Sequence, residues 1–135
     1  MLLLDERILA DGTPARTWAS VEGARFHLRD DDGTAGVLSL AAVDRVMSKY
    51  GRALDPEIAL EGEVLELPDG HRLRRLRFHA AVDATGRDYL VWERSGSEPL
   101  AVIATMATAA LRYLVMRLGA EKSGVSGGAG PASDS

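Results

Sequence analysis

Hydrophobic and polar residues alternate along three successive stretches between residues 58 and 94, as expected for strands with one buried face. Tripeptides that end in glycine separate the stretches at 68–70 and 84–86, and glycine readily takes the left-handed conformation that closes a three-residue hairpin loop. The pattern therefore predicts a three-stranded antiparallel meander.

The two loops set a register in which Leu67 faces His71, and a one-residue slip would exchange the faces of the sheet. One face of this sheet is apolar and should meet the core: Ile58, Leu60, Val64, Leu76, Phe78, Ala80, Val82, Leu90 and Trp92. The other face is charged and carries Glu61, Glu63, Arg75, Arg77 and Glu93. The register also sets five charged residue pairs opposite each other: Glu66–Arg72, Glu63–Arg75, Glu61–Arg77, Arg77–Glu93 and Asp83–Arg87. The arginines of residues 72–77 should therefore be neutralised by acids on the neighbouring strands.

Two helices are predicted from apolar spacing. The first covers residues 39–54, with Ser39 as its N-cap, and ends before Pro56. The second covers residues 98–118 and has no charged side chain between Pro99 and Leu111. A helix that is apolar nearly all round should meet protein on both sides, and it is too interrupted by arginines to span a membrane.

Upstream, residues 16–21 and 24–29 form a predicted hairpin, whereas residues 1–14 could be an edge strand or one short helical turn. Asp31-Asp32-Gly33 is interpreted as a plain turn, because the later ligands of a calcium loop are missing. The predicted fold is α+β, an antiparallel sheet of about five strands with two helices in the order ββαβββα. In topology alone this order resembles small dimeric scaffold folds of the roadblock type, without a family motif, and it implies no function.

Residues 1–120 are expected to form a single domain, followed by a disordered Gly/Ser-rich tail at 121–135. The chain has no cysteine, so neither disulfides nor thiolate metal sites are available. Only three leucines precede Asp5 and Glu6, which is too short for a signal peptide, and a cytoplasmic location is expected by default.

The chain is acidic, with a net charge of −4 and a pI near 5.3, so it has no global positive field for nucleic acid or an anionic membrane. The basic run of residues 71–79 is the exception. Its arginines could contact a single strand of nucleic acid through Arg72, Arg74, Arg75 and Arg77, but the predicted ion pairs favour a solvated charged face.

The tripeptide Arg-Phe-His occurs twice, at 25–27 and 77–79, by chance or through a distant duplication. His27 and His79, with Asp83 nearby, are the candidates for acid–base catalysis, and His79, Tyr89 and Arg77 are the candidates for ligand binding. No nucleophile or metal-ligand spacing accompanies them. We therefore expect no metal and no cofactor.

The uncharged segment 98–118 carries the leading functional hypothesis, a non-enzymatic homodimeric interaction or accessory protein. The other explanation is that the chain's own sheet and first helix cover this segment. Its predicted interface residues are Ala101, Ala104, Thr105, Ala107, Thr108, Ala109 and Leu111. The expected partner is a second copy or another protein; the alternatives are a small-molecule binder or enzyme with a pocket between sheet and helices, and a nucleic-acid binder.

Overall fold

The computed structural model describes residues 1–78, 86–94 and 101–129, with side chains up to Gly119 except that of Asp69. The fold is α+β, with two four-stranded antiparallel sheets and two helices in the order ββββαββββα. The first half contains β1 (Leu2–Ile8), β2 (Pro14–Glu22), β3 (Arg25–Asp30), β4 (Ala35–Ser39) and α1 (Leu40–Tyr50). The second half contains β5 (Val64–Glu66), a 3-10 turn (Pro68–Gly70), β6 (Arg72–Arg77), β7 (Asp88–Arg94), β8 (Ala101–Ala107) and α2 (Thr108–Ala129).

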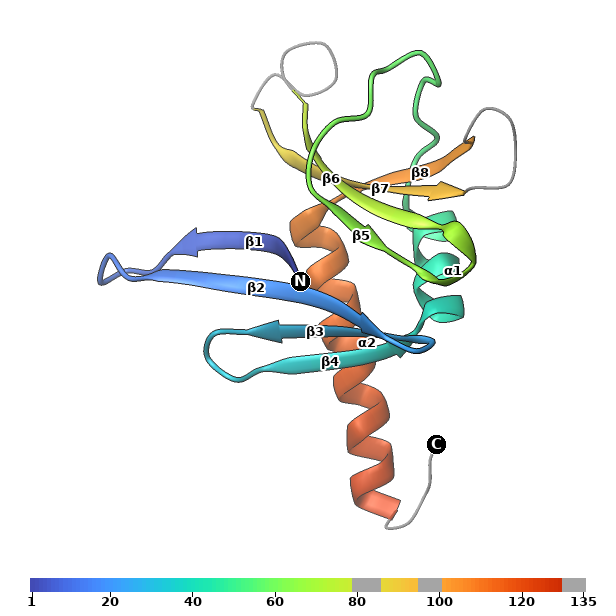
Figure 1. Cartoon of the computed structure of the whole chain (residues 1–135). Helices are drawn as coiled ribbons and strands as arrows, with labels where there is room; N and C mark the ends of the chain where they lie inside the picture. The colour runs from blue at the N-terminus through green and yellow to red at the C-terminus, as the bar shows by residue number, and fades with distance from the viewer. Residues whose placement is uncertain (79–85, 95–100, 130–135) are drawn as a thin grey trace.

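Each half places its strands side by side in chain order, and each fourth strand continues directly into a helix. The helices then cross over: α2 packs mainly against β4 of the first sheet, and α1 packs against β8 of the second (Figure 1). Glycine permits one of these close approaches, since a Cβ on Gly36 would lie 3.0 Å from the Val115 carbonyl oxygen. The two halves are therefore joined by an exchange of helices.

The α+β class and the two helices are confirmed, but the strand count and order are corrected. Residues 1–14, which the sequence left open, contain β1, whose Leu2 and Leu4 are buried. Alternating burial of Gly36 and Leu38 marks β4, a strand that the sequence analysis missed. The turn at Asp31-Asp32-Gly33 is confirmed, and the resemblance to roadblock-type topology does not survive the new order.

The first helix is shorter than predicted. Ser39 caps it as expected, its Oγ accepting the Ala42 N–H at 3.1 Å, but the helix ends at Tyr50 instead of residue 54. Beyond it, Arg52 forms a bridge to Thr105, with backbone N···O distances of 2.8 and 2.6 Å. The residues that follow the helix therefore pair with the edge of β8.

The helix predicted at 98–118 is wrong over residues 101–107, which form β8, and α2 begins only at Thr108. Alanines favour a helix, yet Val102, Ile103 and Thr105 are β-branched and favour a strand. The ladder with β7 decides between them, because buried backbone groups on β7 need partners. The domain boundary at residue 120 and the tail at 121–135 stay predictions.

The β5–β6 register is confirmed: Leu65 pairs with Leu73 and Glu66 with Arg72, and the Leu67 N–H donates to His71 O at 2.8 Å. The chain leaves the ladder at Gly62, so the predicted Glu61–Arg77 pair does not form. The β6–β7 register is wrong, because Trp92 pairs with Leu73 and not with Phe78. The loop at 84–86 that set it, with Ala80, Val82 and Asp83, lies outside the described residues.

The corrected register divides the second sheet's apolar residues between two faces. Leu73, Leu90 and Trp92 join the main core, which includes residues of both sheets and both helices. The opposite face carries a smaller cluster, here called the outer cluster, of Leu76, Phe78, Tyr89 and Val91. Residues 54–60 supply the side chains that pack against it, Leu54, Ile58 and Leu60.

Candidate functional site

The arginines of β6 are all paired with acids, as predicted, although most of the partners differ. The predicted Arg75–Glu63 pair is present at 3.5 Å. The remaining pairs are Arg75–Asp88 at 2.8 Å, Arg77–Asp88 at 3.0 Å, Arg72–Glu93 at 3.4 Å and Arg74–Glu93 at 3.3 Å. Glu93 is 1% exposed, so two guanidinium groups share one buried carboxylate. The four guanidinium groups of this strand therefore share three carboxylates, and none of them is without an acidic partner.

A second buried acid, Asp30, joins the two halves. Its carboxylate is 4% exposed and accepts from the Arg112 guanidinium of α2 at 2.5 Å and from the Thr17 hydroxyl of β2. Arg7 lies 3.6 Å away. Burial alone would raise the pKa of Asp30, but hydrogen bonds from Arg112 and Thr17 and the charges of Arg112 and Arg7 hold that pKa below its ordinary value of 3.8.

A cavity of about 420 Å³ lies beside this acid, lined by Met1, Trp18, Arg29, Asp30, Asp31 and Gly33. Its acids are already engaged: Asp30 with Arg112, and Asp31 as acceptor of the Arg16 backbone N–H at 2.9 Å. The arrangement is that of a structural clamp between sheet and helix.

The histidine candidates are not brought together by described contacts. His27 lies on β3, where its Nε2 is 3.8 Å from Glu22, whereas His79 and Asp83 fall outside the described residues. Tyr89 is 8% exposed and packs edge-to-face on Phe78, with centroids 5.2 Å apart. Arg77, the third ligand-binding candidate, is the last residue of β6 in the same sheet. Of the two Arg-Phe-His tripeptides, the first begins β3 at Arg25, whereas only Arg77 and Phe78 of the second are described and Arg77 is the last residue of β6.

The predicted interface residues are distributed over β8 and the start of α2. Ala104, Thr105, Thr108 and Leu111 are each no more than 5% exposed within the single chain. Ala107 is half-buried, and Ala101 and Ala109 are exposed. Burial inside the chain therefore covers part of the described segment, as the other explanation expected, and the interface between copies stays a prediction.

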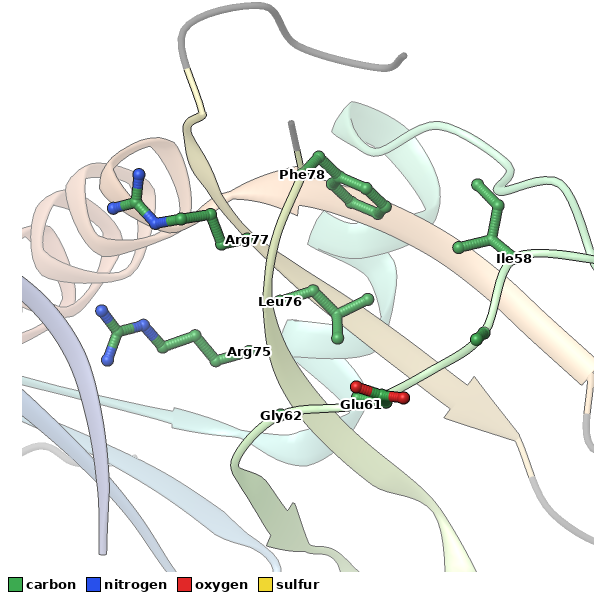
Figure 2. A pocket seen from close by; sticks show the side chains of 8 residues that line it. Ile58, Glu61, Gly62, Arg75, Leu76, Arg77 and Phe78 are labelled. Carbon is green, nitrogen blue, oxygen red and sulfur yellow. The ribbon is translucent and has the colours of Figure 1, made fainter. Parts of the chain in front are cut away.

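A hollow of about 400 Å³ opens where β5 stops short, and sequence reasoning missed it. It lies between residues 58–62 and the end of β6, and its lining residues are Ile58, Ala59, Glu61, Gly62, Arg75, Leu76, Arg77 and Phe78. Figure 2 shows Leu76, Phe78 and Ile58 on the hollow's side of β6, while the guanidinium groups of Arg75 and Arg77 point to the opposite side. The floor is therefore the edge of the outer cluster.

Gly62 produces the opening. Its φ of +124° suits glycine, and a Cβ there would lie 2.1 Å from the Arg75 carbonyl oxygen. The backbone therefore crosses close over β6 and turns away before it can pair further. The sequence did contain a signal, because a glycine inside a strand pattern often marks a bulge or a close backbone approach.

One acid lines the hollow, the exposed Glu61, and no ion pair joins it to another described residue. Glu57 and Glu63, which flank the lining residues 58–62 in the sequence, are also exposed, and Glu63 is paired with Arg75. Two arginines, Arg75 and Arg77, line the hollow as well, but their guanidinium groups are turned away and paired with Asp88. The hollow thus combines an apolar floor with one unpaired carboxylate.

Among the described residues, no group of three or more His, Cys, Asp or Glu side chains is arranged to hold a metal ion. Over the same part of the chain, neither helix has the length and apolar character needed to cross a membrane.

Comparison of the chain with protein families, with curated proteins and with solved structures gave no match.

Proposed function

We propose that the protein is a non-enzymatic accessory protein that binds a segment of a partner protein in the hollow beside β6. The observation that carries the proposal is the apolar floor of Leu76, Phe78 and Ile58 beside the exposed carboxylate of Glu61. Its volume of about 400 Å³ lies within the range of ligand sites in proteins.

Glu61 specifies the sign of the ligand's charge. Its exposed carboxylate attracts a cation and repels an anion, and the two arginines that line the hollow, Arg75 and Arg77, are paired with Asp88. Apolar contact with Leu76 and Phe78 supplies the other part of the binding energy. The favoured ligand carries apolar side chains next to lysine or arginine.

Self-association through residues 98–118 remains a proposal, but it receives less support. Four of its seven predicted interface residues, Ala104, Thr105, Thr108 and Leu111, are buried against their own chain. The exposed hydrophobic residues of the described part of this segment are Ala101, Ala109, Ala110, Tyr113 and Leu118. The nucleic-acid alternative is weakened in the same way, because the arginines of β6 are paired with acids.

A peptide titration tests the proposal. The probe is a fluorescent peptide of roughly six residues, about the length of a strand, that alternates valine with threonine and ends in lysines. We expect it to bind the full chain, and Ala59→Trp, which fills the hollow from an exposed position, to weaken binding at least about tenfold. Ala53→Trp, exposed in the same loop but outside the hollow, is the matched control.

Charge reversal provides the second arm. Glu61→Lys should weaken binding of the lysine peptide and strengthen binding of the same peptide ending in glutamates, whereas Glu22→Lys makes the same change in net charge on the first sheet and should do neither. The proposal fails if the lysine peptide does not bind at millimolar concentration, or if Ala59→Trp and Ala53→Trp have equal effects.

A further inference from the structure

β5 covers only half of β6. The ladder pairs β5 with Arg72, Leu73 and Arg74, and one further bond joins the Arg75 N–H to the Glu63 carbonyl at 2.9 Å. β6 itself continues to Arg77. The last part of the strand therefore has a neighbour on one side, β7, and the hollow on the other.

Alternation along the strand determines which backbone groups point into the hollow. The Phe78 N–H donates to Arg87 O at 3.3 Å, so the even-numbered residues direct their N–H and C=O groups toward β7. Arg75 bonds in the opposite direction, toward residue 63, and Arg77 follows it by two residues. The Arg77 N–H and C=O therefore point to the side that the chain vacates at Gly62, and no hydrogen bond joins them to another described residue.

We propose that the partner's segment binds as an extended strand added to the edge of β6, in line with β5 and paired through the backbone of Arg77. The inference rests on the proposed function of the hollow and specifies the conformation in which the segment binds and the strand with which it pairs. Strand addition to an exposed edge draws affinity from backbone hydrogen bonds and specificity from alternate side chains.

The geometry sets the sequence pattern of the segment. Its residue opposite Arg77 directs its side chain to the face of Arg77 and Asp88, where those two already form an ion pair at 3.0 Å. The residues before and after it direct theirs to the Leu76 and Phe78 face, into the hollow. The segment therefore has the pattern apolar–any–apolar, with lysine or arginine beyond it to meet Glu61.

N-methylation of the peptide probe tests the backbone part of the inference. Each methyl group removes one donor N–H, so methylation at successive positions should weaken binding at least about tenfold at one position and little at the next, in alternation. Losses without alternation, or no losses at all, would overturn strand addition. In that case the proposed function would still hold if Ala59→Trp weakens binding of the unmethylated peptide.

Amide exchange of Arg77, followed by NMR on the full chain, is the second measurement. We expect fast exchange in the free protein and at least about tenfold slowing when the lysine peptide saturates the hollow, with Phe78, bonded to Arg87, as the internal control. If the Arg77 amide is already slow without peptide, the chain's own residues occupy the edge and the inference is wrong. If the peptide does not bind at all, the proposed function fails together with it.

Discussion

The two halves of the molecule have the same order of elements but finish their sheets differently. In the first half β1 pairs with β2 from Leu2 to Ile8, whereas in the second half β5 is reduced to Val64–Glu66. The shortening leaves the end of β6 beside a hollow lined by the exposed Glu61. The same order of elements thus gives a long first strand in one half and a short one, which leaves part of β6 unpaired on that side, in the other.

The halves also differ in how each stabilises a buried acid. Glu93 of β7 is neutralised by Arg72 and Arg74 of its own sheet, but Asp30 of β3 depends on Arg112, which α2 brings from the other half. The buried carboxylate of the second sheet thus has its cations within the same sheet, whereas the closest cation to the buried carboxylate of the first sheet comes from α2. Four predictions test this contrast.

The largest expected effect is the loss of the cross-half clamp. Arg112→Met leaves the carboxylate of Asp30, 4% exposed, without its closest cation, which should lower the free energy of unfolding by about 3–5 kcal/mol. Urea unfolding followed by circular dichroism measures it. Arg45→Met, exposed on α1, should stay within about 0.5 kcal/mol of the parent protein, and equal losses in the two variants would contradict the clamp.

Next in size is the turn that opens the second sheet. Gly62→Ala places a Cβ against the Arg75 carbonyl at a positive φ and should cost about 2–3 kcal/mol. Gly23→Ala, also at positive φ but with nothing within 4 Å, should cost only about 1 kcal/mol in the same assay. An equal cost at both sites would mean that the backbone does not cross β6 at Gly62.

The third prediction concerns pH. Since its partners lower the pKa of Asp30 in the folded state, this group stabilises the fold above its unfolded pKa, near 3.9, and the contribution is lost as pH falls through the folded value. Unfolding free energy should therefore decline below about pH 4. Asp30→Asn should make that decline shallower, whereas Asp32→Asn, in the exposed turn, should leave its slope unchanged.

The smallest effect is expected at His27. Its side chain is 33% exposed and lies 3.8 Å from Glu22, so His27→Ala should change the free energy of unfolding by no more than about 0.5 kcal/mol. It should also leave peptide binding at the hollow unchanged, because His27 belongs to the first sheet. A marked loss of stability would contradict the minor role given to His27, and a marked loss of binding would indicate that the peptide contacts β3.

Local signals predicted the parts of the fold that depend on neighbouring residues. Ser39 identified the start of α1, and the 68–70 loop fixed the β5–β6 register. The β6–β7 register failed because the connection runs from Phe78 to Arg87 and is longer than a three-residue turn. Segment 101–107 failed because alanine content favoured a helix, while pairing with β7, which the sequence alone does not reveal, decided for a strand.

The hollow was beyond sequence reasoning for a related reason. Strand alternation continued through residues 60–63 and predicted that Glu61 would pair with Arg77. The conformation of Gly62 ended the ladder first, and a single glycine indicates a break without indicating its direction. Only the placement of Leu76, Phe78 and Ile58 around the vacated space turns that break into a candidate site.

The dependence of Asp30 on Arg112 has a consequence for synthesis on the ribosome. Thr17, Asp30 and the apolar surface of β4 emerge long before α2, which is translated last among the described elements and supplies their partners. A nascent chain that has completed only the first sheet would hold Asp30 with Thr17 and Arg7 but without Arg112, its closest cation, beside uncovered hydrophobic residues. The first half is therefore expected to reach its full stability only when translation reaches α2.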